Sequence, residues 1–230
     1  MNNLIAISGL KNAGKDTVAE MLQYCFSVPR ILQNYWGYTH YKNAFEPKVN
    51  KIAFADALKW TLSVLFGIPI EKFYDREFKE KMYIQPSKIE LTDHPKKRLI
   101  LTDNQFSKAL KNRDFSFLKE KYITIRQLLQ CVGTEIVRHN LGEDFWVKRI
   151  LIMDRPTIIS DLRFESELKA VKEKGGTIIF VDNPKCEPSN HESESAVLQM
   201  LENQEFDYVI ENNGSMKDLF NRVLNIYKQW

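Results

Sequence analysis

Residues 9–17, which read GLKNAGKDT, have the types and spacing that bind a chain of phosphates. They match the pattern G-x-x-x-x-G-K, in which glycines let the backbone curl and aim successive N–H groups at phosphate oxygens. The lysine of the pattern, Lys15, would neutralise the β- and γ-phosphates of a nucleoside triphosphate. An apolar strand before the loop and a helix after it are the context that the pattern requires. We therefore expect the donor nucleotide to contact Gly9, Asn12, Ala13, Gly14, Lys15, Asp16 and Thr17.

The residue after this lysine departs from the usual pattern. A serine or threonine normally holds Mg²⁺ there, whereas this chain has Asp16 followed by Thr17. A carboxylate ligates Mg²⁺ directly or through water, and we favour such a metal role for Asp16. The alternative is that Asp16 only complements the positive end of the helix dipole. We expect Thr17 to hydrogen-bond an α-phosphate.

A second acid, Asp161, follows an apolar run at 156–160 and precedes Arg163 by two residues. Open α/β sheets bind ligands at the carboxyl ends of their strands, which is where both side chains should emerge. Asp161 would hold the water shell of Mg²⁺, receive a substrate group or simply pair with Arg163. We favour a functional role and expect Asp161, like Asp16, near the metal.

Phosphoryl transfer needs cations, because two negatively charged groups approach each other. Arginine suits a terminal phosphate, since its planar fork donates two parallel hydrogen bonds. Composition alone does not choose among the candidate cations, which are Lys15, Lys59, Arg76, Arg126 and Arg163. Trp146 would stack on a base or lie in the core, and both interpretations stay open.

Overall composition argues against several other classes of protein. A net charge of +3 is too small to indicate a nucleic-acid partner, and no segment approaches the roughly 20 apolar residues of a membrane span. The three cysteines are scattered and the four histidines are unclustered, which disfavours zinc and nucleophilic triads. We expect a cytoplasmic protein that binds neither membrane nor nucleic acid.

The elements that must position these residues alternate between strands and helices. Apolar runs predict strands at 4–8, 51–54, 156–161, 177–181 and 206–210. Helical spacing predicts helices at 16–26, 57–66, 143–153 and 165–174, with two more that begin near 125 and at Ser215. This alternation favours an α/β fold of the P-loop NTPase type, with a parallel sheet sandwiched by helices.

Two stretches lack a sustained period. We interpret residues 27–50 as an irregular connection or a small hairpin. The charged, proline-broken stretch at about 84–121 is too long for a plain loop in a compact domain, so it is expected to form an inserted lid or subdomain. The alternative is a long surface loop that is exposed to solvent. The whole chain, 1–230, is then a single kinase-type domain with one insertion.

Taken in order, several segments resemble the phage-type deoxynucleoside monophosphate kinases, which are relatives of adenylate kinase and dephospho-CoA kinase. The likeness covers most of the chain except the stretches near 30–50 and 84–121. GKDT is weakly diagnostic alone, whereas the ordered set is specific. The similar segments lie at 9–17, 54–59, 74–77, 126–130, 133–135, 145–147, 160–163, 191–194 and 212–215.

This resemblance implies transfer of the γ-phosphate of ATP to a deoxynucleoside 5′-monophosphate, with Mg²⁺ and no covalent intermediate. It implies that the segment 212–214, with Asn213 and Gly214, lies near the adenine of the donor, and it suggests a homodimer. Catalytic roles would fall to Lys15, Arg126, Asp161 and Arg163. The acceptor would be bound by Lys59, Arg76, Arg126, Gln130, Gly133, Thr134, Trp146, Asp161 and Arg163.

Two other functions stay open from the residues. One is a P-loop kinase for another small phosphorylated acceptor, such as dephospho-coenzyme A. The other is a non-catalytic protein that binds a nucleoside triphosphate without turnover. A nucleic-acid enzyme is disfavoured by the low net charge and the lack of a helicase-like second domain. The base of the acceptor cannot be read from these residues, because a few hydrogen bonds in a pocket decide it.

Overall fold

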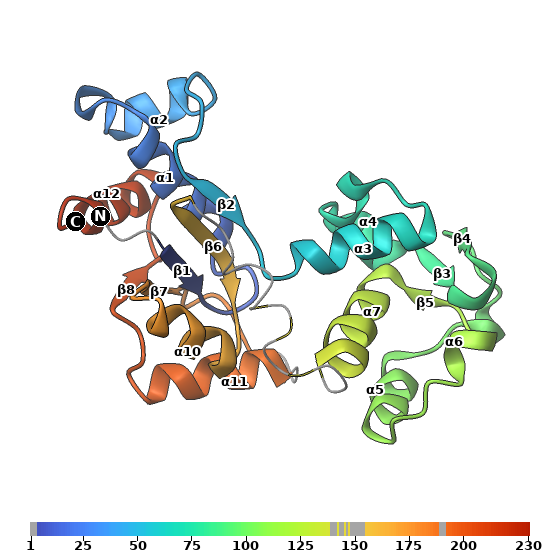
Figure 1. Cartoon of the computed structure of the whole chain (residues 1–230). Coiled ribbons are helices and arrows are strands. Elements are labelled where there is room, and N and C mark those ends of the chain that lie inside the picture. The colour runs from blue at the N-terminus through green and yellow to red at the C-terminus, as the bar shows by residue number, and fades with distance from the viewer. Residues whose placement is uncertain (1–3, 139–141, 143–144, 146, 148–154, 189–191) are drawn as a thin grey trace. The chain divides into compact units, whose positions relative to one another are not determined.

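The computed structural model describes residues 4–138, 142, 145, 147, 155–188 and 192–230. The chain forms two compact units (Figure 1). The first, here called the sheet unit, comprises Met1–Phe54 and Val147–Trp230. The second, here called the middle unit, is the intervening segment Ala55–Trp146. The prediction of a single domain with an insertion at 84–121 stays a prediction.

The sheet unit is built on five parallel strands in the order β2-β6-β1-β7-β8. Ile5 of the central strand lies opposite Ile158 on one side and Thr177 on the other. Runs rich in isoleucine and valine favour such strands, because both faces of a parallel sheet are buried. The strands are β1 (Leu4–Ser8), β2 (Asn50–Ile52), β6 (Thr157–Leu162), β7 (Thr177–Asp182) and β8 (Tyr208–Glu211).

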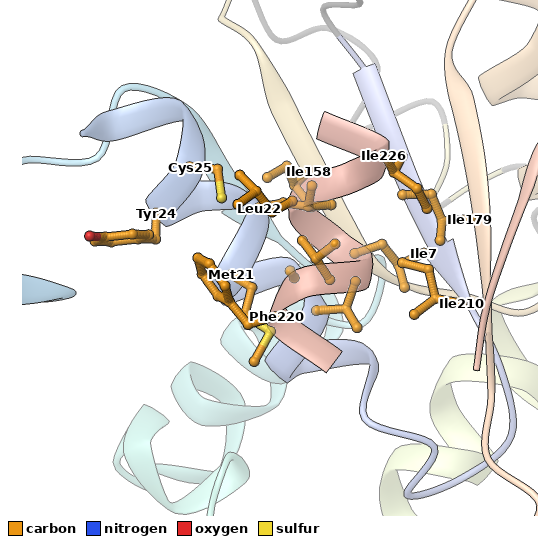
Figure 2. Close-up of a cluster of buried hydrophobic side chains, with 14 of the residues drawn as sticks. Ile7, Met21, Leu22, Tyr24, Cys25, Ile158, Ile179, Ile210, Phe220 and Ile226 are labelled. Carbon is orange, nitrogen blue, oxygen red and sulfur yellow. The ribbon is translucent and has the colours of Figure 1, made fainter. Parts of the chain in front are cut away.

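Helices cover both faces of this sheet. Alternate residues of β1 divide between two cores, with Ile5 and Ile7 in one and Ala6 in the other. The first core lies against α1 and α12, and Figure 2 shows Met21, Leu22 and Phe220 in it. The second core contains side chains of α10 and α11. The helices of the unit are α1 (Lys15–Ser27), the 3₁₀ turn η1 (Arg30–Leu32), α2 (Tyr35–Tyr41), α10 (Glu165–Glu173), α11 (Glu192–Glu202) and α12 (Met216–Tyr227).

This arrangement confirms the predicted α/β fold with a parallel sheet between layers of helices. The capping box predicted at Ser215 is also confirmed, because Ser215 Oγ accepts from the Asp218 N–H while the Asp218 carboxylate accepts from the Ser215 N–H. The hairpin considered for residues 27–50 is wrong. Asn34 caps a helix there, since its Oδ1 accepts from the Gly37 N–H, and the short α2 follows.

The middle unit has a core of its own, which includes Phe73, Ile84, Ile123 and Leu128. Its three strands form an antiparallel sheet in the order β4-β3-β5. The segment 84–121 contributes buried side chains to this core, Phe106 among them. The elements are α3 (Asp56–Phe66), η2 (Ile70–Phe73), α4 (Arg76–Lys81), β3 (Tyr83–Gln85), η3 (Pro86–Lys88), β4 (Glu90–Thr92), η4 (Lys97–Leu99), α5 (Asp103–Lys111), α6 (Phe117–Glu120), β5 (Ile123–Thr124), α7 (Ile125–Gln130) and the π-helix η5 (Cys131–Arg138).

The helix predicted from 125 onward forms as α7 and continues as the π-helix. The helix predicted at 143–153 falls almost entirely outside the described residues. Among the helices that the structure does describe, none has the length and apolar character needed to cross a membrane.

Candidate functional site

The phosphate loop joins the end of β1 at Ser8 to the start of α1 at Lys15. Its two glycines adopt backbone conformations that other residues rarely take, with φ of 147° at Gly9 and 102° at Gly14. A Cβ on Gly9 would lie 2.6 Å from the Val181 carbonyl oxygen, and one on Gly14 would lie 2.6 Å from Asn212 Nδ2. Only glycine therefore fits at either position without a shift of its neighbours.

The N-terminus of α1 is open to an anion. Gly14 is its N-cap and supplies no side chain to accept from the first N–H groups of the helix. Within the loop, Asn12 takes a left-handed conformation with φ of 67°, which asparagine tolerates better than most residues. The buried Ala13 donates its N–H to the Leu10 carbonyl at 3.1 Å, which closes the curl. Thr17 lies in the first turn of α1 and is half-buried.

The Lys15 ammonium group is folded back onto its own loop. Its Nζ donates to the Gly9 carbonyl at 2.8 Å and to the Leu10 carbonyl at 2.7 Å. Burial, followed by the positive charge of Arg163, lowers the pKa of Lys15 to about 8. The carboxylates of Asp161, Asp16 and Glu194 oppose this change. Arg163 and the three acids therefore act electrostatically on the Lys15 ammonium group.

Asp161 and Arg163 lie at the carboxyl end of β6 and just beyond it, beside the loop strand. One Asp161 oxygen, Oδ1, accepts from the Phe54 N–H at 2.6 Å. The Arg163 guanidinium donates from Nη1 to Ser193 Oγ at 3.3 Å, and the same Nη1 lies 4.0 Å from Glu194 Oε1. The expectation that both side chains emerge at this edge of the sheet agrees with the structure.

The acids expected to hold a metal fit Mg²⁺ by their chemistry. Asp16 is exposed in the first turn of α1, and Asp161 is half-buried. Mg²⁺ in nucleotide sites takes one or two protein carboxylates and completes its shell with phosphate oxygens and water. Within the described ranges, no group of three or more histidine, cysteine, aspartate or glutamate side chains could hold a metal ion. The donor set thus suits a metal that arrives with a phosphate.

The segment after β8 reaches the phosphate loop through Asn212, and this contact with the loop was not predicted from the sequence. Asn212 Nδ2 donates to the Ala13 carbonyl at 2.8 Å, and its N–H donates to the Asp182 carbonyl. Asn213, which the resemblance placed near the adenine, donates to Glu211 and accepts from Arg222. The Asn-Asn-Gly turn after a strand was a signal for this site, but nothing in it distinguishes the two asparagines. Gly214 packs against Asp218, whose Oδ2 would lie 2.9 Å from an added Cβ.

A second group of site candidates lies in the middle unit, where α3 and α4 each pack against α7. Lys59 Nζ donates to Asp56 Oδ1 at 2.9 Å and lies 4.1 Å from the centroid of the Tyr74 ring. The Tyr74 hydroxyl donates to the same Asp56 oxygen at 2.7 Å. The side chains of Asp56, Lys59 and Tyr74 therefore join the sequence segments 54–59 and 74–77.

The two arginine candidates of this unit lie on neighbouring helices. Arg76 is the first residue of α4, whose N-cap Asp75 accepts from the Phe78 N–H. Arg126 is the second residue of α7, and its Nε donates to Glu80 Oε1 at 2.9 Å. About 40% of the Arg126 side chain remains exposed, so solvent reaches the guanidinium.

Four further acceptor candidates follow Arg126 along the middle unit. Gln130 is half-buried at the end of α7. Gly133 is buried in the π-helix, where an added Cβ would lie 2.6 Å from Leu58 Cδ2 of α3, so a larger residue would require the Leu58 side chain to move. Thr134 belongs to the same π-helix by its backbone. Trp146 lies outside the described residues.

A family model and two phage proteins that this chain resembles carry the same description. A family model described as "Deoxynucleotide monophosphate kinase" matches residues 70–223. The deoxynucleotide monophosphate kinase of Enterobacteria phage T4 is 23% identical over 98% of this chain and 98% of its own length. That of Escherichia phage RB69 is 23% identical over 98% and 99%. Among solved structures, a dephospho-CoA kinase from Campylobacter jejuni is similar with a TM-score of 0.42 and 16% identity, over 100% of this chain and 97% of that one.

Proposed function

The chain belongs to the deoxynucleotide monophosphate kinase family, and from this premise we propose that it transfers the γ-phosphate of ATP to a deoxynucleoside 5′-monophosphate. The products are ADP and the deoxynucleoside diphosphate. The observation that carries the proposal is the phosphate loop. Two of its backbone positions fit only glycine, its lysine is buried, and the charges of Asp16, Asp161 and Arg163 act on the pKa of that lysine.

The sheet unit supplies the residues that bind the donor. Backbone N–H groups at the N-terminus of α1 would donate hydrogen bonds to the phosphate chain. Lys15 would exchange its two carbonyl acceptors for phosphate oxygens, which are stronger partners because they are charged. Arg163 would offset the charge that develops on the transferred group. Asn213 and Gly214 remain the residues proposed near the adenine.

The middle unit supplies cations for the acceptor phosphate. Lys59, Arg76 and Arg126 come from α3, α4 and α7, of which the first two each pack against α7, and we assign them to that phosphate. Gln130, Gly133, Thr134 and Trp146 are proposed to bind other parts of the acceptor, and the same role is proposed for Asp161 and Arg163 of the sheet unit. An oxygen of the acceptor phosphate attacks the γ-phosphorus, and the bond from that phosphorus to the β–γ bridging oxygen breaks. No covalent enzyme intermediate is needed, since positioning and charge neutralisation carry this reaction.

Asp16 and Asp161 are the residues that would hold Mg²⁺. The ion would neutralise charge on the β- and γ-phosphates. Asp161 can serve while Oδ1 keeps its hydrogen bond from Phe54, because a carboxylate has several acceptor positions.

An acceptor screen tests the proposed function. ADP release is measured with ATP, Mg²⁺ and each of the four deoxynucleoside monophosphates, with dephospho-coenzyme A as a further acceptor. Turnover with one or more deoxynucleotides is expected, and it would also reveal the base preference. Turnover with dephospho-coenzyme A alone would assign a different acceptor. ATP binding without any turnover would indicate a binding protein.

The magnesium assignment predicts a specific change in metal dependence. Asp16→Asn and Asp161→Asn should each raise the Mg²⁺ concentration at half-maximal activity by roughly tenfold or more, because each removes one anionic ligand. Asparagine at 161 can still accept from the Phe54 N–H. Glu20→Gln is the matched control, since it removes an equal charge from an exposed site on the same helix. A Mg²⁺ titration of Asp16→Asn that matches the wild type would favour the helix-dipole role instead.

The pKa of Lys15 predicts how donor binding depends on pH. Phosphates favour the charged lysine, and in the free protein this charge is lost as the pH rises through about 8. The association constant of a non-hydrolysable ATP analogue should therefore begin to fall above about pH 7, be roughly halved at about pH 8, and fall by up to about tenfold per pH unit beyond that. Calorimetric titration between pH 7 and 9.5 measures this. Lys228→Met, at an exposed lysine after α12, should keep the same profile. A flat wild-type profile would contradict the role of Lys15.

Two expectations from the sequence accompany the proposal. A homodimer is proposed by analogy with the family. The cytoplasm, where the nucleotide substrates occur, is the proposed compartment.

A further inference from the structure

We propose that Glu194 on α11 is a positioning residue, which orients both the phosphate loop and the Arg163 guanidinium for phosphoryl transfer. The inference rests on the proposed function for the identity of the transferred group. Glu194 lies in the segment 191–194, to which no chemical role has been assigned so far.

Glu194 is a buried acid with partners in two separate parts of the site. It is 2% exposed, and carboxylates are rarely buried unless they are paired. Its Oε1 accepts from the Lys11 N–H at 2.9 Å, across 183 residues of sequence. The same oxygen lies 4.0 Å from Arg163 Nη1. One carboxylate therefore contacts the first half of the phosphate loop and the arginine after β6.

The contact with Lys11 also affects Lys15. The peptide group that joins Leu10 to Lys11 donates its N–H to Glu194, and its carbonyl accepts from Lys15 Nζ at 2.7 Å. Because a peptide group is planar, fixing its N–H fixes the direction of its carbonyl. Glu194 thus helps to orient the Leu10 carbonyl, which accepts from the Lys15 ammonium group and from the Ala13 N–H.

Arg163 is held at both its backbone and its side chain. Its N–H donates to Glu167 Oε2 at 2.8 Å, and Glu167 is 2% exposed. Its guanidinium contacts Ser193 and Glu194 at the start of α11, while 31% of the side chain remains exposed. A group fixed on one side and open on the other is preoriented for an anion.

A positioning role fits Glu194 better than direct contact with substrate. Its carboxylate is negative and buried, so it would repel phosphate oxygens rather than bind them. Its effect must pass through the Lys11 peptide and Arg163. Two substitutions separate these routes. Glu194→Gln keeps an acceptor for the Lys11 N–H and removes the charge that faces Arg163, whereas Glu194→Ala removes both.

The test combines donor binding with turnover. Glu194→Gln should lower kcat by roughly 10- to 100-fold and change the Kd of a non-hydrolysable ATP analogue by less than about threefold. Glu194→Ala should lower kcat similarly and also raise that Kd by roughly tenfold or more, because the loop loses its anchor. Glu202→Gln, which removes an exposed charge at the other end of the same helix, should match the wild type in both.

A double-mutant cycle distinguishes orientation of Arg163 from general damage. In an Arg163→Ala background, Glu194→Gln should have almost no further effect on kcat, because its route to the reaction is gone. Independent, multiplicative effects would overturn the proposal, as would wild-type kcat in Glu194→Gln. Thermal melting of each variant checks the fold. If Glu194→Ala does not fold, Glu194→Gln still tests the proposal, because glutamine keeps the shape of the native side chain.

The Kd of the ATP analogue, which is measured without an acceptor, tests this inference separately from the proposed function. If the wild type binds the ATP analogue and phosphorylates no deoxynucleotide, the proposed function fails. The Kd of Glu194→Ala then still decides the loop contact, since it is measured without an acceptor. An unchanged Kd in Glu194→Ala would overturn the proposed role of the contact between Glu194 and Lys11 in donor binding.

Discussion

Replacement of Lys15 by alanine is expected to lower kcat/KM by about 10³-fold or more, while the protein stays folded. The expected loss is this large because Lys15 carries the charge that faces the β- and γ-phosphates throughout the reaction. Its ammonium group donates to two carbonyls of its own loop. The core beside α1 is formed by other residues of that helix, such as Val18 and Leu22, so its packing should persist.

The measurement is a coupled ADP-release assay with the best deoxynucleotide from the acceptor screen, together with circular dichroism and thermal melting. Lys15→Met should behave like the alanine variant, since it keeps much of the aliphatic stem and loses the charge. Lys228→Ala is a control for the loss of one exposed positive charge. Near-normal activity in either Lys15 variant would refute the assignment of residues 9–17 as the donor phosphate loop.

Replacement of Arg126 by alanine is expected to lower kcat/KM for the deoxynucleotide by about 10²- to 10³-fold. Both parameters should change, with a higher KM and a lower kcat, because the acceptor phosphate changes its charge during transfer. The half-exposed guanidinium pairs with Glu80 in the free protein, and an arriving phosphate would offer it a stronger partner. The Kd of an ATP analogue should stay within about twofold of the wild type.

Two variants make this result specific. Arg126→Lys keeps the charge and loses the fork, so it should retain more activity than Arg126→Ala but less than the wild type. Lys81→Ala removes an exposed cation from the neighbouring α4 and should have little effect, since its partner Glu77 is also exposed. If only the KM for ATP rose in Arg126→Ala, the acceptor role would be wrong and Arg126 would belong to the donor site.

The parallel sheet and the phosphate loop were predictable from local patterns. The isoleucine and valine runs of β1, β6 and β7 predict buried strands, and glycines at 9 and 14 predict the curl before α1. Each signal lies within about ten residues, so no long-range information was needed. The capping box at Ser215 was predictable for the same reason.

The three-stranded sheet of the middle unit was not predictable in this way. Its strands have only two or three residues each, which is too short to show an alternating pattern. Their pairing also joins segments far apart in sequence, such as Ile84 with Ile123. The helix α2 was missed because its aromatic residues have modest helix propensity, and the Asn34 cap became visible only with the contact to Gly37.

The sequence alone determined the kind of chemistry, because the residue types and short spacings of a phosphate loop specify phosphate binding wherever a strand and a helix flank them. Tertiary structure decided which side chains support that loop. Asn212 rather than Asn213 reaches the Ala13 carbonyl, and Glu194 reaches the Lys11 N–H from 183 residues away. Such contacts depend on how strands and helices pack across the sheet, and a single sequence carries no local pattern that records the packing.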